Sequence, residues 1–302
     1  MTTAFSTAAE PLLKSLYLMA TLVEARDPYT GGHLWRVSQF SRILAVDLGL
    51  DATEIARITL GGFLHDLGKI GVPDAILNKT DKLTDEEYAV IQTHPDIGAR
   101  LLSGHPLGQL VYAAVAQHHE RPDGRGYPAR LAGDAIPLDA RIVGLTDAFD
   151  AMTSTRPYRK GMPIEKALGI IGDNLGQQFD SDLGTRLIRL GRDGALDHIV
   201  GHSDLGIPIH ACPMCTGPTL VIKRGQASGS TIYCRACGGE AQIERDGKQI
   251  KVQSTGKMGS ATQLEPDVDD ALISQLVAEA SKQLGWRPAA RGPFGWLQRA
   301  LS

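Results

Sequence analysis

Length, composition and charge set the first limits on this protein. The chain has 302 residues, 42% of them hydrophobic, which is enough for one large domain and a smaller one at roughly 100–200 residues per domain. A formal net charge of −3 excludes a globally basic nucleic-acid-binding protein, so a nucleotide site would need a local group of basic side chains. No stretch reaches the roughly 18 consecutive apolar residues of a membrane helix, and residues 1–10 lack the features of a secretory signal. We therefore predict a cytoplasmic protein without a transmembrane segment.

The first 195 residues are predicted to be helical. Apolar side chains recur at helical spacing over residues 8–25, which indicates a packing helix or, alternatively, a dimerisation helix. Asp51 or Thr53 is expected to cap a later helix, and Thr84 with Glu87 has the sequence of a capping box. The other predicted helices cover residues 33–48, 51 or 53 to 67, 85 onward, 109–119, 138–153, 163–175 and 181–190.

Residues 121–137 form a long loop, rich in Gly and Pro, between two of these helices. Loops of this length are uncommon in compact domains unless they have a function. We therefore favour a loop that closes over a substrate or contacts its base, with a rigid connector as the alternative.

The composition changes near Gly191. Residues with β-type side chains then appear in short runs at 219–222, 231–233 and 249–252, which predict a small β-rich module. Residues 254–267 are polar and expected to be mobile, and residues 268–284 return to a helical period. The tail carries Trp286, Trp296 and Leu297, for which packing of a solvated tail is favoured over contact with a partner or a membrane surface.

The expected fold class is mostly α, an all-helical bundle followed by a small C-terminal β-rich zinc ribbon and a terminal helix. The predicted divisions are an N-terminal helix (1–26), a helical catalytic domain (27–195), a linker (196–209), the β-rich module (210–257) and a C-terminal helix with its tail (266–302).

Two Cys-x-x-Cys pairs lie in the β-rich module: Cys212 with Cys215, and Cys234 with Cys237, with 18 residues between the pairs. This spacing is typical of a four-cysteine zinc site. Four thiolates close a tetrahedral structural site and leave no open position for chemistry, so one structural zinc is the leading prediction. A redox pair or a cluster ligand set is the alternative. A small module of this kind would be held together by its metal and would serve protein contact or regulation.

Histidine and aspartate residues recur through the helical part. Singly, each histidine is more typical of a surface or core position than of a ligand. Together, imidazole and carboxylate groups suit iron or manganese, and their number suits two neighbouring ions better than one tetrahedral ion. Such a pair of ions holds the attacking and the leaving oxygen of a phosphodiester displacement. The candidate ligands are His33, His65, Asp66, His94, His118, His119 and Asp147.

His65 and Asp66 are adjacent at the end of a predicted helix. Because adjacent helical residues point about 100° apart, the pair can serve two neighbouring ions or bridge them. His118 and His119 repeat this arrangement on another helix. Lys69 follows Asp66 by three residues, so we expect it to face the same site and to neutralise charge on a phosphate or a hydroxide.

Several motifs surround these residues in a fixed order. They are Asp27-Pro28-Tyr29-Thr30, His65-Asp66 with Gly68-Lys69-Ile70-Gly71, His118-His119-Glu120 with Asp123-Gly124 and Gly126-Tyr127-Pro128, Asp147-Ala148-Phe149-Asp150-Ala151-Met152, Arg156-Pro157-Tyr158-Arg159 and Gln178-Phe179-Asp180. With these motifs, residues 27–190 resemble the HD-GYP subfamily of the HD superfamily of metal-dependent phosphohydrolases.

The resemblance implies an HD-type helical bundle with ligands at the seven positions named above. Asp66 would bridge two ions, and Lys69 would assist catalysis. Tyr127, Arg156 and Arg159 would contact a cyclic dinucleotide.

Two positions leave the ligand set open. Asp150 is the alternative to Asp147 and would otherwise cap a helix or make an internal hydrogen bond. Some family members carry a carboxylate four residues before the first histidine, where it recruits a third ion. Tyr29 stands at that position, so we expect two ions, although Asp27 or Glu24 could still approach.

The activity that the resemblance implies is metal-dependent hydrolysis of cyclic di-GMP to linear pGpG, with a second cleavage to GMP left open. A water that bridges two cations loses a proton near neutral pH, and the resulting hydroxide would attack one phosphodiester. Arg156 and Arg159 would grip phosphate with planar donors. The alternatives are a hydrolase of a nucleotide or of another cyclic dinucleotide, such as cyclic GMP-AMP, and a catalytically silent signalling module that binds a cyclic dinucleotide. The partners would be this substrate and a regulatory protein on the zinc-ribbon-like module.

Overall fold

The computed structural model describes residues 4–26, 31–79, 81–155, 160–217, 220–246, 249–265 and 268–286. The predictions made for Asp27, Tyr29, Arg156, Arg159, Trp296 and Leu297 lie outside these residues. Within them, no helix combines the length and the apolar character that crossing a bilayer requires.

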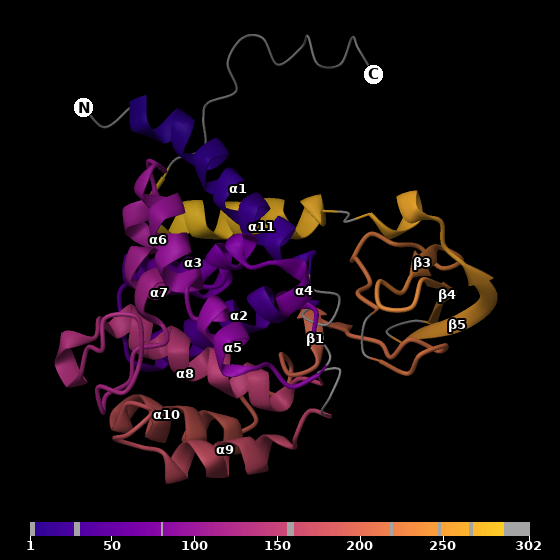
Figure 1. Cartoon of the computed structure of the whole chain (residues 1–302). Coiled ribbons are helices and arrows are strands. Elements are labelled where there is room, and N and C mark those ends of the chain that lie inside the picture. The colour runs from indigo at the N-terminus through magenta and orange to yellow at the C-terminus, as the bar shows by residue number, and fades with distance from the viewer. Residues whose placement is uncertain are drawn as a thin grey trace.

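A helical unit takes up the chain as far as Arg192 and is completed by a helix near the C-terminus (Figure 1). Its α-helices are α1 (Ala4–Glu24), α2 (His33–Asp47), α3 (Ala52–Leu64), α4 (Asp74–Leu77), α5 (Asp85–Ile91), α6 (His94–Ser103), α7 (Tyr112–Gln117), α8 (Leu138–Thr153), α9 (Ile164–Asp173), α10 (Ser181–Arg192) and α11 (Asp270–Gln283). Short 3₁₀ helices are η1 (Leu67–Gly71), η2 (Gly108–Leu110), η3 (Gly133–Ala135) and η4 (Ala261–Leu264).

The local signals for helix starts are confirmed. Asp51 caps α3, and its side chain accepts a hydrogen bond from the backbone N–H of Glu54. Thr84 and Glu87 form a complete capping box at the start of α5. The sequence did not separate α5 from α6; Pro95 lies in the first turn of α6, where its missing N–H costs no helical hydrogen bond.

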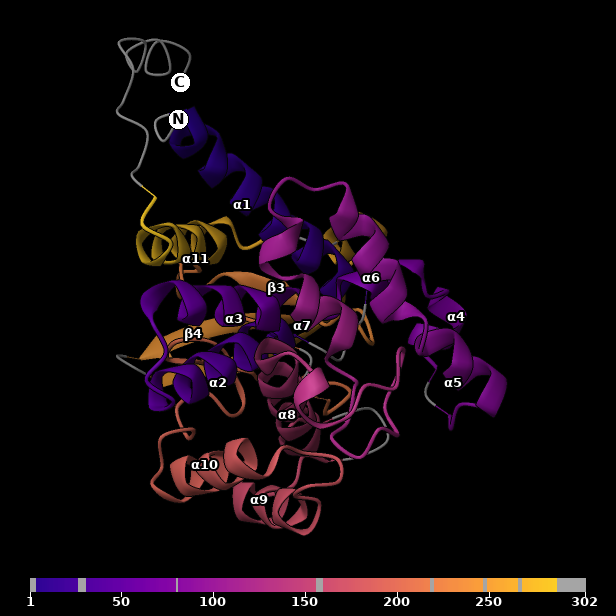
Figure 2. The ribbon, with the colours of Figure 1, turned by 90° about the vertical axis from the view of Figure 1, so that its left-hand side faces the viewer.

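One hydrophobic core joins both ends of the described chain. Leu13 and Leu16 of α1 and Ile273 and Leu276 of α11 are buried in the same cluster as the central helices α2, α3 and α8. Lys14 adds an ion pair with Asp270 between the two helices. α1 is therefore a packing helix of this unit, and α9 and α10 cover its other end beside α2 and α8 (Figure 2).

The C-terminal part forms two small antiparallel sheets. β1 (His202–Asp204) pairs with β2 (Ile207–Pro208), and a three-stranded sheet has the order β3 (Thr231–Tyr233), β4 (Gly239–Asp246), β5 (Gln249–Met258). β4 lacks a predicted counterpart. β5 continues to Met258 where a mobile segment was expected, because Met258 still pairs with Gly239 of β4 after an irregularity in the register.

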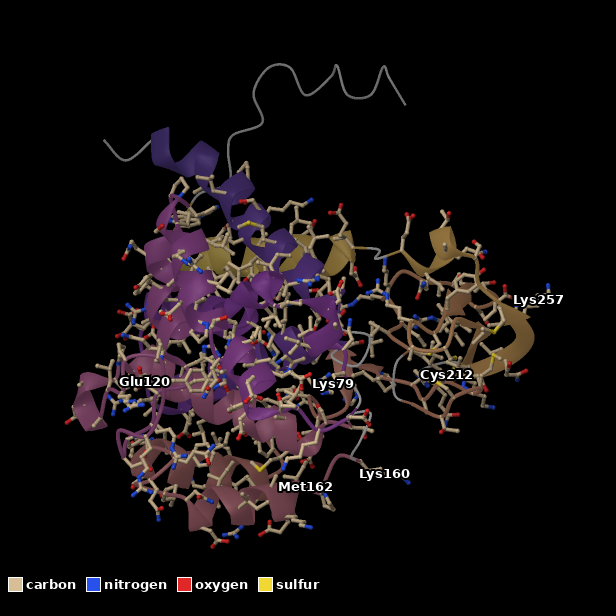
Figure 3. All side chains as sticks on the ribbon, viewed as in Figure 1. Lys79, Glu120, Lys160, Met162, Cys212 and Lys257 are labelled. Atoms are coloured by element: carbon tan, nitrogen blue, oxygen red, sulfur yellow. The ribbon has the colours of Figure 1, made fainter. Side chains whose placement is uncertain are left out.

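The module, defined here as residues 210–265, has its own small buried cluster. Ile232, Ala241 and Ile243 pack there with the buried thiols of Cys212 and Cys234. Figure 3 shows Cys212 inside the module and Glu120 on the opposite side of the molecule.

The segment predicted as a linker packs closely on the helical unit. Leu196 and Ile199 are buried in the main core, and Ser203 of β1 is also buried. Since α11 follows the module and returns to the helical unit, the module is attached to that unit at both of its ends.

Candidate metal centres

Helix ends bring the candidate ligands of the helical unit together. His33 opens α2 and His94 opens α6, whereas His65 follows directly after α3 and His118 directly after α7. Asp147 projects from the middle of α8. Because a helix ends where its chain turns, ligands at such positions can converge from separate directions on one point.

Glycines allow this convergence where the backbones approach closely. A Cβ on Gly68 of η1 would collide with the carbonyl oxygen of His94, and a Cβ on Gly144 of α8 would collide with that of His118. A larger residue at either place would push apart the elements that carry the ligands.

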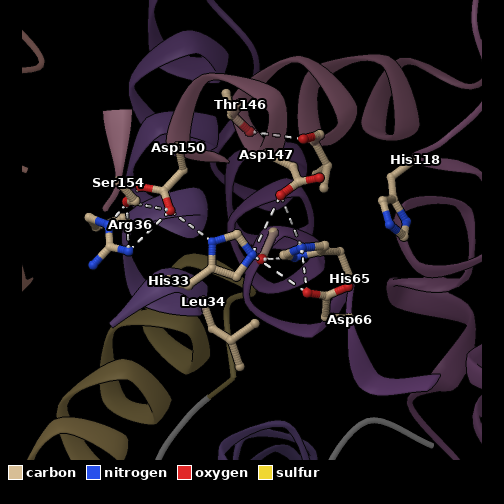
Figure 4. A network of polar contacts seen from close by, with 12 residues as sticks. His33, Leu34, Arg36, His65, Asp66, His118, Thr146, Asp147, Asp150 and Ser154 are labelled. Carbon is tan, nitrogen blue, oxygen red and sulfur yellow. Dashed lines mark hydrogen bonds and ion pairs between the residues drawn. The ribbon is translucent and has the colours of Figure 1, made fainter. Parts of the chain in front are cut away.

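The first cluster consists of His33, His65, Asp66 and Asp147. Oδ2 of Asp66 lies 3.5 Å from Nε2 of His33 and 3.4 Å from Nε2 of His65. Oδ1 of Asp147 lies 3.5 Å and 3.7 Å from the same two nitrogen atoms. Figure 4 shows the two carboxylates on opposite sides of the two imidazoles.

The second cluster consists of His94, His118 and His119, with ligand atoms within 4.8 Å of one another. Oδ1 of Asp66 lies 3.6 Å from Nε2 of His94. One carboxylate therefore directs one oxygen to each cluster, which is the arrangement expected of a bridging ligand.

The hydrogen bonds of the imidazoles show that the two clusters fit cations. The Nδ1–H groups of His65, His94 and His118 donate to the backbone carbonyls of Gly62, Ile91 and Ala114 at 2.8, 2.8 and 2.9 Å. A carbonyl can only accept, so each Nδ1 carries a proton and each Nε2 is the atom that would bind a metal ion. In His94 and His118, which burial keeps neutral, Nε2 presents a lone pair.

Two observations concern these Nε2 atoms. Nε2 of His94 and Nε2 of His118 face each other at 3.2 Å, so two lone pairs oppose each other unless a cation lies between them. Nε2 of His65 is buried without a hydrogen-bond partner among the described residues. Ligand atoms about 2.0–2.2 Å from one ion lie roughly 3.0–3.5 Å apart, which is close to the distances in both clusters.

The second cluster is neutral near pH 7. Burial lowers the pKa of His94 to about 4 and the pKa of His119 to about 3. Burial likewise lowers the pKa of His118 well below its ordinary value. These imidazoles need not lose a proton before they bind a metal ion.

Without a bound metal ion, the imidazoles of the first cluster are protonated and its carboxylates are ionised. Burial alone would lower the pKa of His65, but the carboxylates of Asp66 and Asp147 outweigh it and raise that pKa to about 10. Nearby carboxylates raise the pKa of His33 against burial in the same way. Burial would raise the pKa of Asp66, but Lys69 and His65 hold it well below its ordinary value. A divalent ion bound here takes the place of the protons on the imidazoles.

The family comparison agrees with this geometry. The sequence matches the HD domain family over residues 17–183, which is more than half of the chain. The chain belongs to the HD domain family.

The HD domain of this chain is similar to parts of longer proteins. It is 41% identical over 178 residues to the "Cyclic di-GMP phosphodiesterase response regulator RpfG" of Xanthomonas campestris, a match that covers 58% of this chain and 47% of that protein. It is 40% identical over 177 residues to a "Cyclic di-GMP phosphodiesterase" of Vibrio cholerae, covering 54% and 36%. It is 37% identical over 161 residues to a "3'3'-cGAMP-specific phosphodiesterase 3" of the same species, covering 53% and 35%. The chain thus spans about half or less of the length of these curated relatives.

The remaining predicted residues of the HD domain lie beside the clusters. Nζ of Lys69 is 2.6 Å from Oδ2 of Asp66. The ring of Tyr127 stacks on that of His119 with centroids 4.6 Å apart. Glu24 accepts a hydrogen bond from the backbone N–H of Leu34, so its carboxylate does lie at the start of α2.

A cavity of about 340 Å³ opens beside His119 and Asp147 in the HD domain. Arg121, Arg125 and Arg141 are among its lining residues, but Glu120, Asp147 and Asp180 line it as well, and Arg141 pairs with Asp180 at 2.8 Å. The cavity thus offers cationic side chains without an excess of positive charge. The 121–137 loop forms part of the wall of this cavity. Its conformation is fixed by Glu120, which is buried and accepts hydrogen bonds from the backbone N–H groups of Ala129 and Leu131.

Asp150 and Arg36 are the site residues whose roles the sequence predicted least well. Asp150 accepts a hydrogen bond from Nδ1–H of His33 at 2.8 Å and pairs with the guanidinium of Arg36. Of the two alternatives, Asp147 therefore faces the cluster and Asp150 supports an imidazole from behind. Arg36 carried no sequence signal except its place one turn after His33.

The four cysteines of the module also converge. Their sulfur atoms lie within 4.8 Å of one another, with Cys212 and Cys237 at 3.7 Å and Cys215 and Cys234 at 3.7 Å. With metal–sulfur bonds of about 2.3 Å, the edge of a tetrahedral site is roughly 3.8 Å. A disulfide needs about 2.05 Å, so this geometry fits a tetrahedral ion.

Backbone donors support the cysteine loops. The N–H of Met214 donates to Sγ of Cys212 at 3.4 Å, and the N–H of Gly239 donates to Sγ of Cys237 at 3.4 Å. Each loop thus directs a donor at a sulfur atom, which favours the thiolate form that a metal ion requires.

Proposed function

We propose that this chain is a metal-dependent phosphodiesterase of the HD-GYP type that hydrolyses cyclic di-GMP to linear pGpG, with a second cleavage to GMP left open. The observation that carries the proposal is the carboxylate of Asp66, which directs one oxygen to each of the two ligand clusters. A carboxylate shared by two ligand sets is what a two-ion site for phosphodiester displacement needs. The relatives named cyclic di-GMP phosphodiesterases, at 41% and 40% identity, support this substrate.

In this proposal the two clusters hold two divalent ions, with His33, His65, Asp66 and Asp147 around one and Asp66, His94, His118 and His119 around the other. Iron and manganese both suit such a donor set. When bound, the ions supply a water of lowered pKa and stabilise charge on the phosphoryl group. We propose zinc for the tetrahedral site of the four cysteines, since closed four-thiolate sites of this size typically hold it.

The side chains around the clusters prepare the site for this reaction. The Nδ1–H groups of the imidazoles donate to carbonyl or carboxylate oxygens, so the rings are fixed with their Nε2 atoms toward the centre. The ammonium of Lys69, beside Asp66, is placed to stabilise negative charge on the phosphoryl oxygens.

The cavity next to the clusters is the proposed place for the substrate. Tyr127 lies against His119 at its wall and offers an aromatic face to a nucleobase. Arg121 and Arg125 line the same cavity and can attract phosphates. Arg156 and Arg159, from the motif alone, remain predicted phosphate contacts.

The proposed catalytic domain remains residues 27–195. The helices α1 and α11 share its core and complete it. The module is proposed as a separate metal-stabilised unit that could also receive a regulatory protein.

Cyclic GMP-AMP is the second candidate substrate. The relative named as specific for 3'3'-cGAMP is 37% identical, close to the identity of the cyclic di-GMP relatives. Both dinucleotides share the phosphodiester ring on which the metal centre would act, and they differ in one base.

The decisive experiment measures turnover of both dinucleotides. Protein purified without oxygen and loaded with iron or manganese should convert cyclic di-GMP to pGpG or GMP, identified by chromatography. Asp66→Asn should reduce the rate by a factor of at least about 10³, since removing a core group of a catalytic unit costs that much or more. Asp182→Asn, an exposed position on α10, is the matched control and should retain full activity. Tight binding without turnover by the unchanged protein would instead support a silent signalling module.

A further inference from the structure

The module is docked on the part of the helical unit that carries the first cluster. β1, which leads into the module, lies against α2 (Figure 1), and the turn before α2 is in contact with it: a Cβ on Gly32 would collide with Ser203 of β1. A Cβ on Gly31 would likewise collide with the side chain of Val221. His33 is the next residue after this turn.

Arg36 spans this contact with a single buried guanidinium. Its side chain is almost fully enclosed, at 3% exposure. Nη1 donates to the backbone carbonyl of His202 in β1 at 2.9 Å and to that of Gly31 at 3.0 Å. Nε donates to Oδ1 of Asp150 at 2.6 Å, and Nη2 donates to Oδ2 at 3.1 Å.

Asp150 connects Arg36 to the first cluster. Its side chain is fully buried, and its Oδ2 accepts the Nδ1–H of His33 at 2.8 Å (Figure 4). A continuous buried path therefore runs from the carbonyl of His202 through Arg36 and Asp150 to a ligand of the first cluster. Without Arg36, the carboxylate of Asp150 would be a buried charge with its main partner removed.

A second contact reaches the same cluster from the cysteine loops. Arg235, inside the second Cys-x-x-Cys pair, donates to the carbonyl of Ala25 at 3.0 Å. The neighbouring Arg26 donates to the carbonyls of Lys69 and Ile70 in η1 at 3.2 and 2.9 Å. The loop of Cys234 and Cys237 thus lies against the segment that hydrogen-bonds the backbone of Lys69.

The imidazoles of the second cluster are oriented by backbone groups close to them in the sequence. The Nδ1–H groups of His94 and His118 donate to carbonyls three or four residues earlier in their own turns. Their orientation is therefore local to α6 and α7 and should not depend on the module.

We propose that Arg36 is a positioning residue through which the docked module controls metal binding by the first cluster. The inference rests on the proposed two-ion centre and adds that the two clusters differ in what holds them. The module holds β1 through Arg224, which donates to the buried carboxylate of Asp204. Loss of the metal of the four cysteines would release this contact, Arg36 would lose the carbonyl of His202, and His33 would lose its support. The imidazoles of the second cluster keep their orientation, and its ion is affected only through the shared Asp66. The device makes the catalytic centre depend on the metal state of the module.

Manganese titration of the full chain tests the proposal. Metal-free protein with zinc restored to the module should bind two Mn²⁺ ions tightly. Calorimetry measures the binding, and the spectrum of the spin-coupled Mn²⁺ pair shows that both ions are bound. In Arg36→Lys, which keeps a positive charge beside Asp150, one ion should bind about 10–100-fold more weakly and the pair signal should disappear at concentrations that saturate the unchanged protein. Arg57→Lys is the matched control, because Arg57 of α3 also binds a buried aspartate of α8, Asp139, at 2.9 Å but lies away from the clusters.

A double-mutant cycle assigns the weakened ion. If Arg36 acts through His33, then Arg36→Lys adds no further loss to His33→Ala, whereas it adds its full loss to His94→Ala. Equal losses in both backgrounds would overturn the proposal.

The role of the module is tested with a double variant of the full chain, Cys234→Ser with Cys237→Ser. Loss of zinc should weaken the same Mn²⁺ ion about tenfold or more, while hydrogen exchange shows α3 and α8 still protected. Two Mn²⁺ ions bound with unchanged affinity by this variant would overturn the proposal even if Arg36→Lys failed to fold. Fewer than two tight ions in the unchanged protein would instead refute the two-ion centre itself.

Discussion

The helical unit and the module place different candidate ligands in different positions relative to their cores, imidazole and carboxylate groups in the first and thiols in the second. In the helical unit, helices from both ends of the described chain share a large apolar core, and the histidine and aspartate clusters lie at helix ends beside it. In the module, Cys212 and Cys234 are themselves part of a small buried cluster. A metal ion would therefore lie at the edge of one core and at the centre of the other, so metal binding would be separable from folding in the helical unit and coupled to folding in the module.

Metal removal should separate the two regions most strongly. After treatment with a chelator that strips both kinds of site, we expect the amides of β3, β4 and β5 to lose their protection from hydrogen exchange, because the remaining apolar cluster is too small to hold the sheet. The amides of α3 and α8 should stay protected. Mass spectrometry of exchanged peptides measures both, and a protected sheet without metal would break the comparison.

A core truncation in the helical unit is the complementary test. Leu16→Ala removes a fully buried side chain between α1 and the central helices and should lower the free energy of unfolding by about 2–5 kcal/mol. Leu22→Ala, at a position 50% exposed on the same helix, is the control and should change it by less than about 0.5 kcal/mol. Urea unfolding followed by helical circular dichroism measures the difference. Equal effects would mean that α1 is not part of the core.

The smallest expected effect concerns a surface ion pair of the helical unit. Hydrogen bonds and charge from Arg189 and Arg186 of α10 hold the pKa of Asp47, at the end of α2, below its ordinary value of 3.8. A carboxyl whose pKa is lower in the folded state stabilises it at higher pH and loses this effect as pH falls through the folded-state pKa. Asp47→Asn should therefore be slightly less stable than the unchanged protein at pH 7, and the difference should vanish in acid below pH 3.8. Thermal unfolding across this pH range measures it; a difference that persists in acid would show that the ion pair is not its cause.

Much of the candidate site could be predicted from single residues and their neighbours. The capping signals at Asp51 and Thr84 are local, and helices begin where they predicted. The adjacency of His65 and Asp66 predicted a pair that serves two neighbouring ions or bridges them, since adjacent side chains diverge by about 100°. The bridging role of Asp66 was implied by the resemblance to the HD-GYP subfamily. The division of labour between Asp147 and Asp150 needed the structure. Three residues apart on one helix, they differ by about 60° around the helix axis and by roughly 4.5 Å along it. Their two carboxylates meet opposite nitrogen atoms of the same imidazole.

The sequence by itself determined the helical class of the main unit, the seven candidate ligands and the four-cysteine set, because each is written in local spacing and residue type. The tertiary structure alone decided how the ligands divide into two clusters around Asp66 and how the module is docked. Arg36 and the carbonyl of His202 are 166 residues apart, and a backbone carbonyl has no identity in the sequence. Such contacts depend on how whole elements pack, and packing is a property of the complete chain.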